Sequence, residues 1–179
     1  THKGLTFAWD YRDDDCGDTP WERDCGVGVV SDWEQRAKSP GERVLSSDHG
    51  SHRFYDFAGT MKIAKRDGWG LNPADVAELA TKLGRTPTPG DITAEAVERD
   101  YQRMRGWCND DWCYVGIVVT LLDVDGNETD MRDSLWGIES DAGDYLEEVA
   151  HDLAENLASE VGSRKKYIQQ GHNRIKVRA

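Results

Sequence analysis

The sequence predicts an α+β fold in which an antiparallel sheet, with a central hairpin at about 112–138, packs against several helices. Two observations predict this class. Strand-like and helix-like segments do not alternate regularly, as they would in a doubly wound parallel sheet. Two pairs of strand-like segments are also joined by short polar turns, which is typical of antiparallel hairpins. Because the chain has 179 residues, 37% of them apolar, we expect one domain over 1–179.

The first part of the chain is predicted to contain one strand and one short helix. Residues 4–11 alternate between apolar and polar side chains, which favours a strand. An acidic stretch then predicts a loop to about residue 28. Ser31 and Glu34 have the spacing of a capping box, so we expect a short helix that ends before Pro40.

A hairpin and three helices are predicted for the middle of the chain. The hairpin joins 42–46 to 52–55 through a polar turn. The helices are expected at about 57–65, 73–83 and 92–104. Their predicted N-caps are Asp56, Asn72 and either Asp91 or Thr93. The segment 86–90 contains two prolines and is the clearest boundary in the sequence.

The last third is predicted to hold the main hairpin and the longest helix. Residues 112–123 are rich in Val, Ile, Thr and Tyr, Asp125 and Gly126 supply a turn signal, and 128–138 returns. From 141 to about 161, apolar residues recur on one stripe and predict an amphipathic helix. A basic C-terminal tail, 162–179, follows it.

The distribution of charge favours a basic partner. The 22 Lys and Arg against 34 Asp and Glu leave a formal net charge of -12, which argues against direct binding to nucleic acid. Residues 108–160 contain fifteen acidic residues and one basic residue, Arg132. We therefore expect a protein partner with a basic surface. The alternative is an acidic surface that only keeps the protein soluble.

The acidic residues of the predicted last helix have a regular spacing. Separations of three, four, four and three residues place five carboxylates on one helical stripe: Asp141, Asp144, Glu148, Asp152 and Glu155. They would span roughly 21 Å, about one charge per 5 Å, which is of the same order as the phosphates of one DNA strand at about 3.4 Å. The stripe therefore predicts a surface that mimics nucleic acid.

Two further acids and a tryptophan are candidate contact residues beside this stripe. Asp110, Asp111 and Trp112 are adjacent at the start of the predicted main strand. An exposed Trp with an acidic rim would be a binding hot spot, whereas a buried one would anchor the core. We include all three in the predicted partner-binding set.

No motif predicts an enzyme. Neither a nucleophile elbow nor a phosphate-binding loop occurs, so we expect no catalytic residues and no cofactor. A zinc site is the alternative for the cysteines, because two pairs of thiolates could close a tetrahedron. Those four residues are Cys16, Cys25, Cys108 and Cys113. A small metal-binding protein or enzyme with a dispersed His, Cys and acid site is therefore the alternative function.

The apolar segments are too short for a membrane span. The longest, 115–122, falls well below the roughly 20 residues that cross a bilayer. We expect a protein that does not contact membranes, lies in a reducing cytoplasm and keeps its cysteines as thiols. The sequence does not fix the oligomeric state.

Four short stretches carry a resemblance to a known family. They are Arg53–Phe57 (RFYDF), Arg66–Trp69 (RDGW), Trp107–Asp110 (WCND) and Ser134–Asp141 (SLWGIESD), the last continuing to Glu148. Over about 20–160 the chain resembles a family of small acidic proteins encoded by tailed bacteriophages and prophages. The resemblance carries no catalytic residues. It implies a protein that binds and inhibits host machinery, such as restriction or CRISPR complexes, and a phage structural or assembly protein is the alternative.

Overall fold

The computed structural model describes residues 4–15, 18–23 and 27–176, with side chains as far as residue 162. The chain forms two compact units, each with its own hydrophobic core. Unit 1 comprises Thr1–Cys16 and Trp112–Ala179, and unit 2 comprises Gly17–Asp111. We expected one domain with its clearest boundary at 86–90, and that segment lies inside unit 2. Helices and antiparallel strands occur together, which confirms the α+β class.

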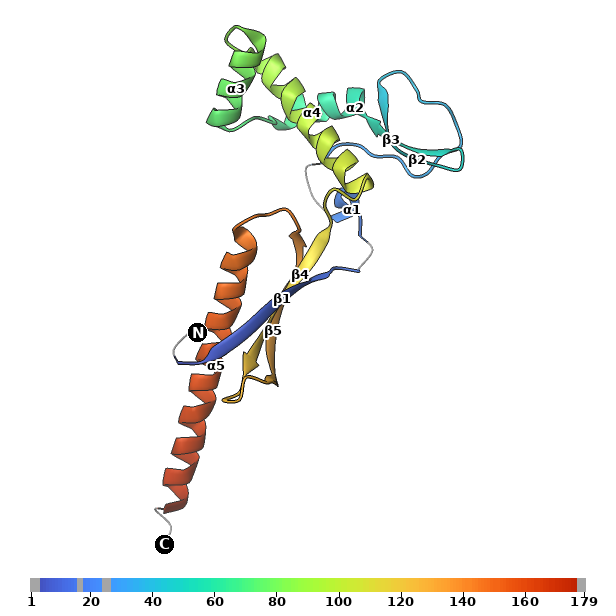
Figure 1. Cartoon of the computed structure of the whole chain (residues 1–179). Coiled ribbons are helices and arrows are strands. Elements are labelled where there is room, and N and C mark those ends of the chain that lie inside the picture. Colours follow the sequence, from blue (N-terminus) through green and yellow to red (C-terminus); the bar gives the residue numbers. More distant parts are fainter. Residues whose placement is uncertain (1–3, 16–17, 24–26, 177–179) are drawn as a thin grey trace. The chain divides into compact units, whose positions relative to one another are not determined.

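Unit 1 is a three-stranded antiparallel sheet with a long helix on one face (Figure 1). β4 (Tyr114–Leu122) lies between β1 (Thr6–Asp13) and β5 (Glu128–Glu139). The predicted central hairpin is therefore confirmed. The helix, α5 (Tyr145–Lys176), contacts β4 and β5. Its backbone continues into the basic tail as far as Lys176, while the side chains beyond residue 162 lie outside the described part.

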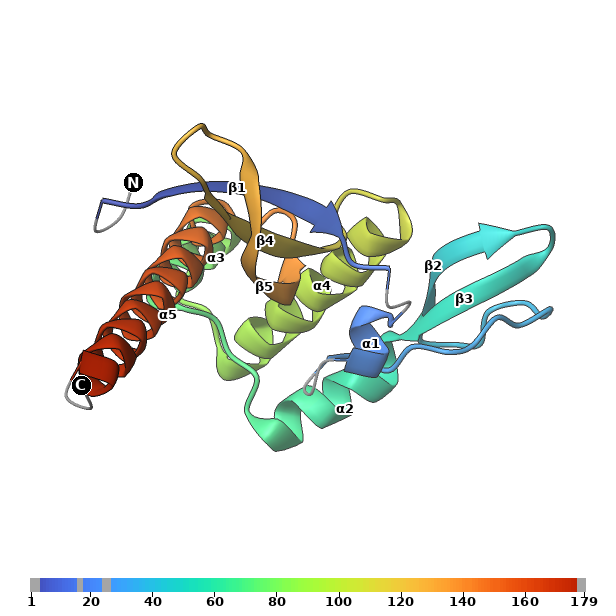
Figure 2. The ribbon, with the colours of Figure 1, turned by 90° about the horizontal axis from the view of Figure 1, so that it is seen from below.

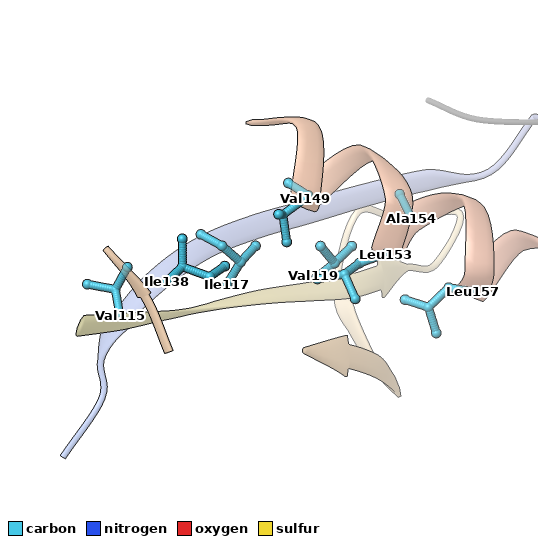
Figure 3. Close-up of a cluster of buried hydrophobic side chains, with 9 residues drawn as sticks. Val115, Ile117, Val119, Ile138, Val149, Leu153, Ala154 and Leu157 are labelled. Atoms are coloured by element: carbon cyan, nitrogen blue, oxygen red, sulfur yellow. The ribbon is translucent and has the colours of Figure 1, made fainter. Parts of the chain in front are cut away.

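The core of unit 1 lies between α5 and the sheet (Figure 3). Alternate residues of β4 point toward α5 because side chains alternate along a strand. The apolar stripe of α5 meets them at helical spacing. The buried members are Val115, Ile117, Val119, Ile138, Val149, Ala150, Leu153, Ala154 and Leu157. Each fully buried Val, Leu or Ile stabilises the fold by roughly 1.5–3 kcal/mol relative to an exposed one.

Gly116 marks a close approach on the opposite face of this sheet. Its neighbours Val115 and Ile117 face α5, so a side chain at 116 would point the other way. A Cβ atom there would overlap the ring of Trp136 on β5. Only glycine leaves room for the indole this close to the backbone of the central strand.

Unit 2 combines a hairpin with four helices among its described residues. Its elements are α1 (Pro20–Arg23), β2 (Glu42–Asp48), β3 (Ser51–Asp56), α2 (Phe57–Asp67), α3 (Pro73–Leu83) and α4 (Pro89–Cys108). α4 is central, because it contacts α1, α2, α3 and β2. The buried core residues are Leu45, Tyr55, Ala64, Val97, Tyr101 and Met104.

The helix starts of unit 2 confirm two predicted caps and correct the third. Asp56 accepts a hydrogen bond from the Gly59 N–H at 2.8 Å, and Asn72 accepts one at the start of α3. α4 begins at neither Asp91 nor Thr93. Its N-cap is Thr88, which forms a reciprocal capping box with Asp91. Pro89 in this segment therefore starts a helix, because Pro at the first helical position has no N–H to leave unpaired.

The short helix predicted to begin at Ser31 is absent, and this prediction was wrong. The segment runs beside β3 instead, as Figure 2 shows. The Ser31 N–H donates to the Phe54 carbonyl at 2.8 Å. Glu34 and His52 exchange backbone hydrogen bonds at 2.9 and 2.8 Å. Pairing with a strand uses the backbone groups that a helix would need for its own hydrogen bonds.

A buried tyrosine links three parts of unit 2. The Tyr55 hydroxyl donates to the Asp100 carboxylate at 2.5 Å, and the Gly28 N–H donates to the same oxygen at 2.9 Å. Burial raises the pKa of Asp100, and these two hydrogen bonds oppose that increase. Burial, followed by the hydrogen bond to Asp100, raises the pKa of Tyr55. The pair fastens β3 and the segment that precedes β2 to α4.

Candidate protein-binding surface

The exposed side of α5 carries the predicted carboxylates. Its apolar stripe packs on the sheet, so residues about half a turn away face solvent. We define the acidic face as the four residues Asp144, Glu148, Asp152 and Glu155, all of which are exposed. The last three lie within α5. Asp144 directly precedes the helix, and its carbonyl accepts the Glu148 N–H at 3.1 Å, so it continues the row.

Asp141 is not part of this helical row, which corrects the predicted stripe of five. The structure has a turn at 140–144 and begins α5 at Tyr145. Gly143 adopts a left-handed conformation with φ of 61°, which a right-handed helix does not tolerate. The Ala142 N–H donates to the Glu139 carbonyl, so the chain turns sharply before the helix starts. Asp141 is exposed but lies in that turn.

A hollow of about 380 Å³ borders the acidic face. We call it the Trp9 hollow. β1 and β4 contribute one wall and α5 contributes the other. Its lining residues are Phe7, Trp9, Val119, Glu147, Ala150, His151 and Ala154. On a helix, Glu147 and His151 lie between the packed stripe and the acidic face, so the hollow and that face are continuous.

Two aromatic side chains of β1, Trp9 in the hollow and Tyr11 beyond it, are exposed because β1 is an edge strand. Trp9 is 45% exposed and Tyr11 is 64% exposed. They pair with Val119 and Ile117, so they point to the same side of the sheet as those buried residues. The apolar stripe of α5 covers the β4 side chains, whereas β1 lies one strand farther out.

The carboxylates of this surface are mostly uncompensated. Asp144, Glu147, Glu148 and Asp152 form no ion pair with any residue whose side chain the structure describes. Glu147 brings one of these charges to the rim of an indole-lined hollow. An indole face and nearby carboxylates both attract a cation, since the ring face carries negative electrostatic potential. This combination suits a lysine or arginine side chain.

Trp112 is not a surface hot spot, and this part of the prediction was wrong. It is only 4% exposed and packs edge to face with Tyr114 at a centroid distance of 5.4 Å. Its role is therefore core packing. Asp110 and Asp111 are exposed, but they end unit 2, whereas the acidic face and the Trp9 hollow belong to unit 1.

The cysteines form no cluster within the described residues. Cys16 and Cys25 lie outside them. Cys108 ends α4 in unit 2 and is half-buried, while Cys113 is exposed in unit 1. Burial raises the pKa of the Cys108 thiol, which disfavours the thiolate. No group of three or more His, Cys, Asp or Glu suited to a metal occurs in the described part.

Sequence reasoning did not identify Trp9 and Tyr11 as exposed aromatic residues and therefore as candidate contact residues. The alternating pattern of 4–11 placed Phe7 and Trp9 on one side of a strand, but did not show which strand would lie at the edge. Edge position follows from pairing with β4, more than a hundred residues away. The signal available locally was an aromatic pair, Trp9 and Tyr11, beside Asp10 and Asp13.

Comparisons with known proteins give no match: no family model, no curated protein and no solved structure is similar to this chain. Among the described helices, none is both long enough and apolar enough to cross a membrane.

Proposed function

We propose that this protein is a non-enzymatic binding protein that occupies a basic, nucleic-acid-binding groove of a host protein with the acidic face and the Trp9 hollow. The partner would be a defence or nucleic-acid-handling complex, and occupation of its groove would inhibit it. The observation that carries the proposal is that four carboxylates without an ion pair to a described side chain (Asp144, Glu147, Glu148 and Asp152) are continuous with a half-exposed indole on one side of unit 1.

The two parts of the surface would contribute differently. The acidic face offers carboxylates from Asp144 to Glu155 over about 16 Å, at a helical rise of about 1.5 Å per residue. This row would face cations that otherwise contact phosphates. The Trp9 hollow would receive one Lys or Arg side chain, and a desolvated cation over an indole contributes about 2 kcal/mol. Complementary charge mainly accelerates association, whereas the buried aromatic contact slows dissociation.

The proposed phage origin supports this role. The four stretches that resemble small acidic phage proteins include Ser134–Asp141, which leads into α5. A phage protein that inhibits a host complex needs no active site. An acidic surface that repels nucleic acid, and that attracts the basic groove in which the host complex binds nucleic acid, is sufficient for inhibition.

Affinity capture from a bacterial host lysate treated with nuclease tests the proposal. Wild-type protein should retain a partner that a triple charge reversal loses: Asp144→Lys, Glu148→Lys and Asp152→Lys. The matched control reverses three exposed acids in the β4–β5 turn and the first residues of β5: Asp125→Lys, Glu128→Lys and Asp130→Lys. Both triple variants change the net charge by the same amount in the same unit.

A second pair of variants tests the hollow. Trp9→Ala should weaken capture about tenfold or more, as expected for an aromatic hot spot. Trp33→Ala removes an equally exposed tryptophan, 46% against 45%, from unit 2 and should leave capture unchanged. Circular dichroism of each variant confirms that it is folded. Equal capture by all variants would reject the proposed surface.

A further inference from the structure

Unit 2 contains a concave surface whose charge is opposite to that of the acidic face. It is a hollow of about 640 Å³ formed by β2, the C-terminal part of α4 and the segment before β2. We call it the cationic pocket. Its polar lining residues are Lys38, Arg43, Ser46, Ser47, Arg105 and Asn109. No carboxylate is among its lining residues, although the chain has a net charge of -12.

The cations of this pocket are incompletely paired. Lys38 and Arg105 are exposed and form no ion pair or hydrogen bond through their side chains with any described residue. Other arginines of unit 2 do pair with carboxylates: Arg36, Arg66, Arg85 and Arg99. These two unpaired cations lie together at a hollow that no acidic side chain lines.

Arg43 is held in place at the pocket wall. Its guanidinium stacks on the Phe57 ring at 3.8 Å and contacts the Glu98 carboxylate at 2.5 Å. The Tyr101 hydroxyl donates to the Val44 carbonyl at 3.1 Å and fixes α4 against β2. The wall is thus preorganised before any ligand binds, which reduces the entropy that binding would cost.

A third arginine adds positive charge beside the pocket. The β2–β3 register shifts between Val44 and Ser46, and Ser46 then pairs with Arg53. The Arg53 guanidinium lies 4.7 Å from the Trp21 ring and 5.3 Å from the Trp33 ring. Its Nε is buried and has no hydrogen-bond partner in the described structure. No described carboxylate pairs with this guanidinium.

We propose that the cationic pocket binds the phosphate groups of a small phosphorylated ligand. Lys38 and Arg105 supply unpaired positive charge, and Arg43, although paired with Glu98, adds a third cation at the wall. The Ser46 hydroxyl and the Asn109 amide supply further donors for phosphate oxygens, while the Ser47 hydroxyl is hydrogen-bonded to His52 Nδ1 at 2.8 Å. Several cations around one hollow match a ligand with more than one negative charge. A long nucleic acid carries the same chemistry, but the net charge of -12 opposes its approach. This inference is independent of the proposed function.

Calorimetric titration with inorganic tripolyphosphate tests the inference. The wild-type protein should bind one equivalent, with an affinity that falls as salt rises. The double variant Lys38→Gln with Arg105→Gln should bind tripolyphosphate at least about tenfold more weakly than the wild type does. It loses two charge-assisted hydrogen bonds, which are stronger than hydrogen bonds between neutral groups. The control variant, Lys62→Gln with Lys65→Gln, loses the same charge on α2 outside the pocket and should bind as the wild type does.

No binding at millimolar tripolyphosphate, or an equal loss in both double variants, would overturn the inference. Urea unfolding of each variant checks that the pocket variant is folded. A second titration with a single-stranded oligonucleotide distinguishes the phosphate source. We expect no displacement of tripolyphosphate, and displacement would assign the pocket to a nucleic-acid backbone.

Discussion

Trp9 and Val119 face each other across β1 and β4, yet Val119 is 1% exposed and Trp9 is 45% exposed. The difference arises because α5 covers the central strand and leaves part of the edge strand open. One residue of the pair therefore builds the core, while the other lines the Trp9 hollow beside Glu147.

The charge around each exposed tryptophan predicts which ions will quench it. Trp9 lies beside Glu147, so the ratio of caesium to iodide quenching should be about twofold higher for Trp9 than for a tryptophan in neutral surroundings. Trp33 lies beside the Arg53 guanidinium and should show the reverse. Comparing wild type with Trp9→Phe and with Trp33→Phe isolates the two contributions. Unchanged caesium quenching in Trp9→Phe would contradict the assigned environment.

The Arg36–Glu42 pair predicts an acid-dependent loss of stability. Hydrogen bonds from Arg36, then from Ser39, lower the pKa of Glu42 from 4.5 to about 2. Below pH 4.5 the unfolded carboxyl binds a proton that the folded one does not, so stability falls as pH falls toward 2. The difference in urea midpoint between wild type and Glu42→Gln should therefore shrink below pH 4.5.

The control for this measurement is Glu128→Gln, because Glu128 is exposed and has no ion pair to a described residue. Its midpoint should follow that of the wild type across the range. A constant difference between wild type and Glu42→Gln from pH 6 to 3 would contradict the prediction.

Removing the Tyr55 hydroxyl should destabilise unit 2. Tyr55→Phe leaves the Asp100 carboxyl with the Gly28 N–H as its remaining partner among the hydrogen bonds described above. Loss of one partner from a buried polar group costs about 1–3 kcal/mol of unfolding free energy. The pKa of Asp100 should also rise, because the lost hydrogen bond lowers it. Urea unfolding and carboxyl titration by NMR measure the two effects.

A double-mutant cycle separates this hydrogen bond from general packing. Tyr55→Phe should cost less in an Asp100→Asn background, where no charge remains to be stabilised. If the losses of unfolding free energy in the two single variants add up to the loss in the double variant, the two residues are not coupled.

Gly116→Ala should destabilise unit 1 by about 1–3 kcal/mol, because the added methyl group overlaps the Trp136 ring. The same substitution in a Trp136→Ala background should cost much less, since the clash is removed. Thermal unfolding followed by circular dichroism measures both. Equal costs in the two backgrounds would show that the indole does not occupy this position.

Local sequence signals predicted the elements whose stability is local. The cap at Asn72 and the stop at Gly84 bound α3 as predicted, because capping depends on neighbouring residues. Ser31 and Glu34 carried an equally good local signal, but their backbone groups pair with β3. Long-range pairing outweighed the local signal there.

The candidate site could be predicted only where it depends on local sequence. Helical spacing identified the row from Asp144 to Glu155. Asp141 is not in the row, because the left-handed conformation of Gly143 prevents the helix from starting earlier in the chain. Burial of Trp112 and exposure of Trp9 depend on tertiary contacts that no local pattern contains. The aromatic part of the surface therefore required the structure.

Competition with duplex DNA tests the central claim most directly. After capture of a partner from nuclease-treated lysate, a duplex oligonucleotide is titrated onto the complex. Because the protein and DNA would occupy the same basic groove, the account predicts that DNA releases the partner and that the Asp144, Glu148 and Asp152 reversal never binds it. A ternary complex with DNA, or a partner that binds the reversal variant equally well, would contradict the claim.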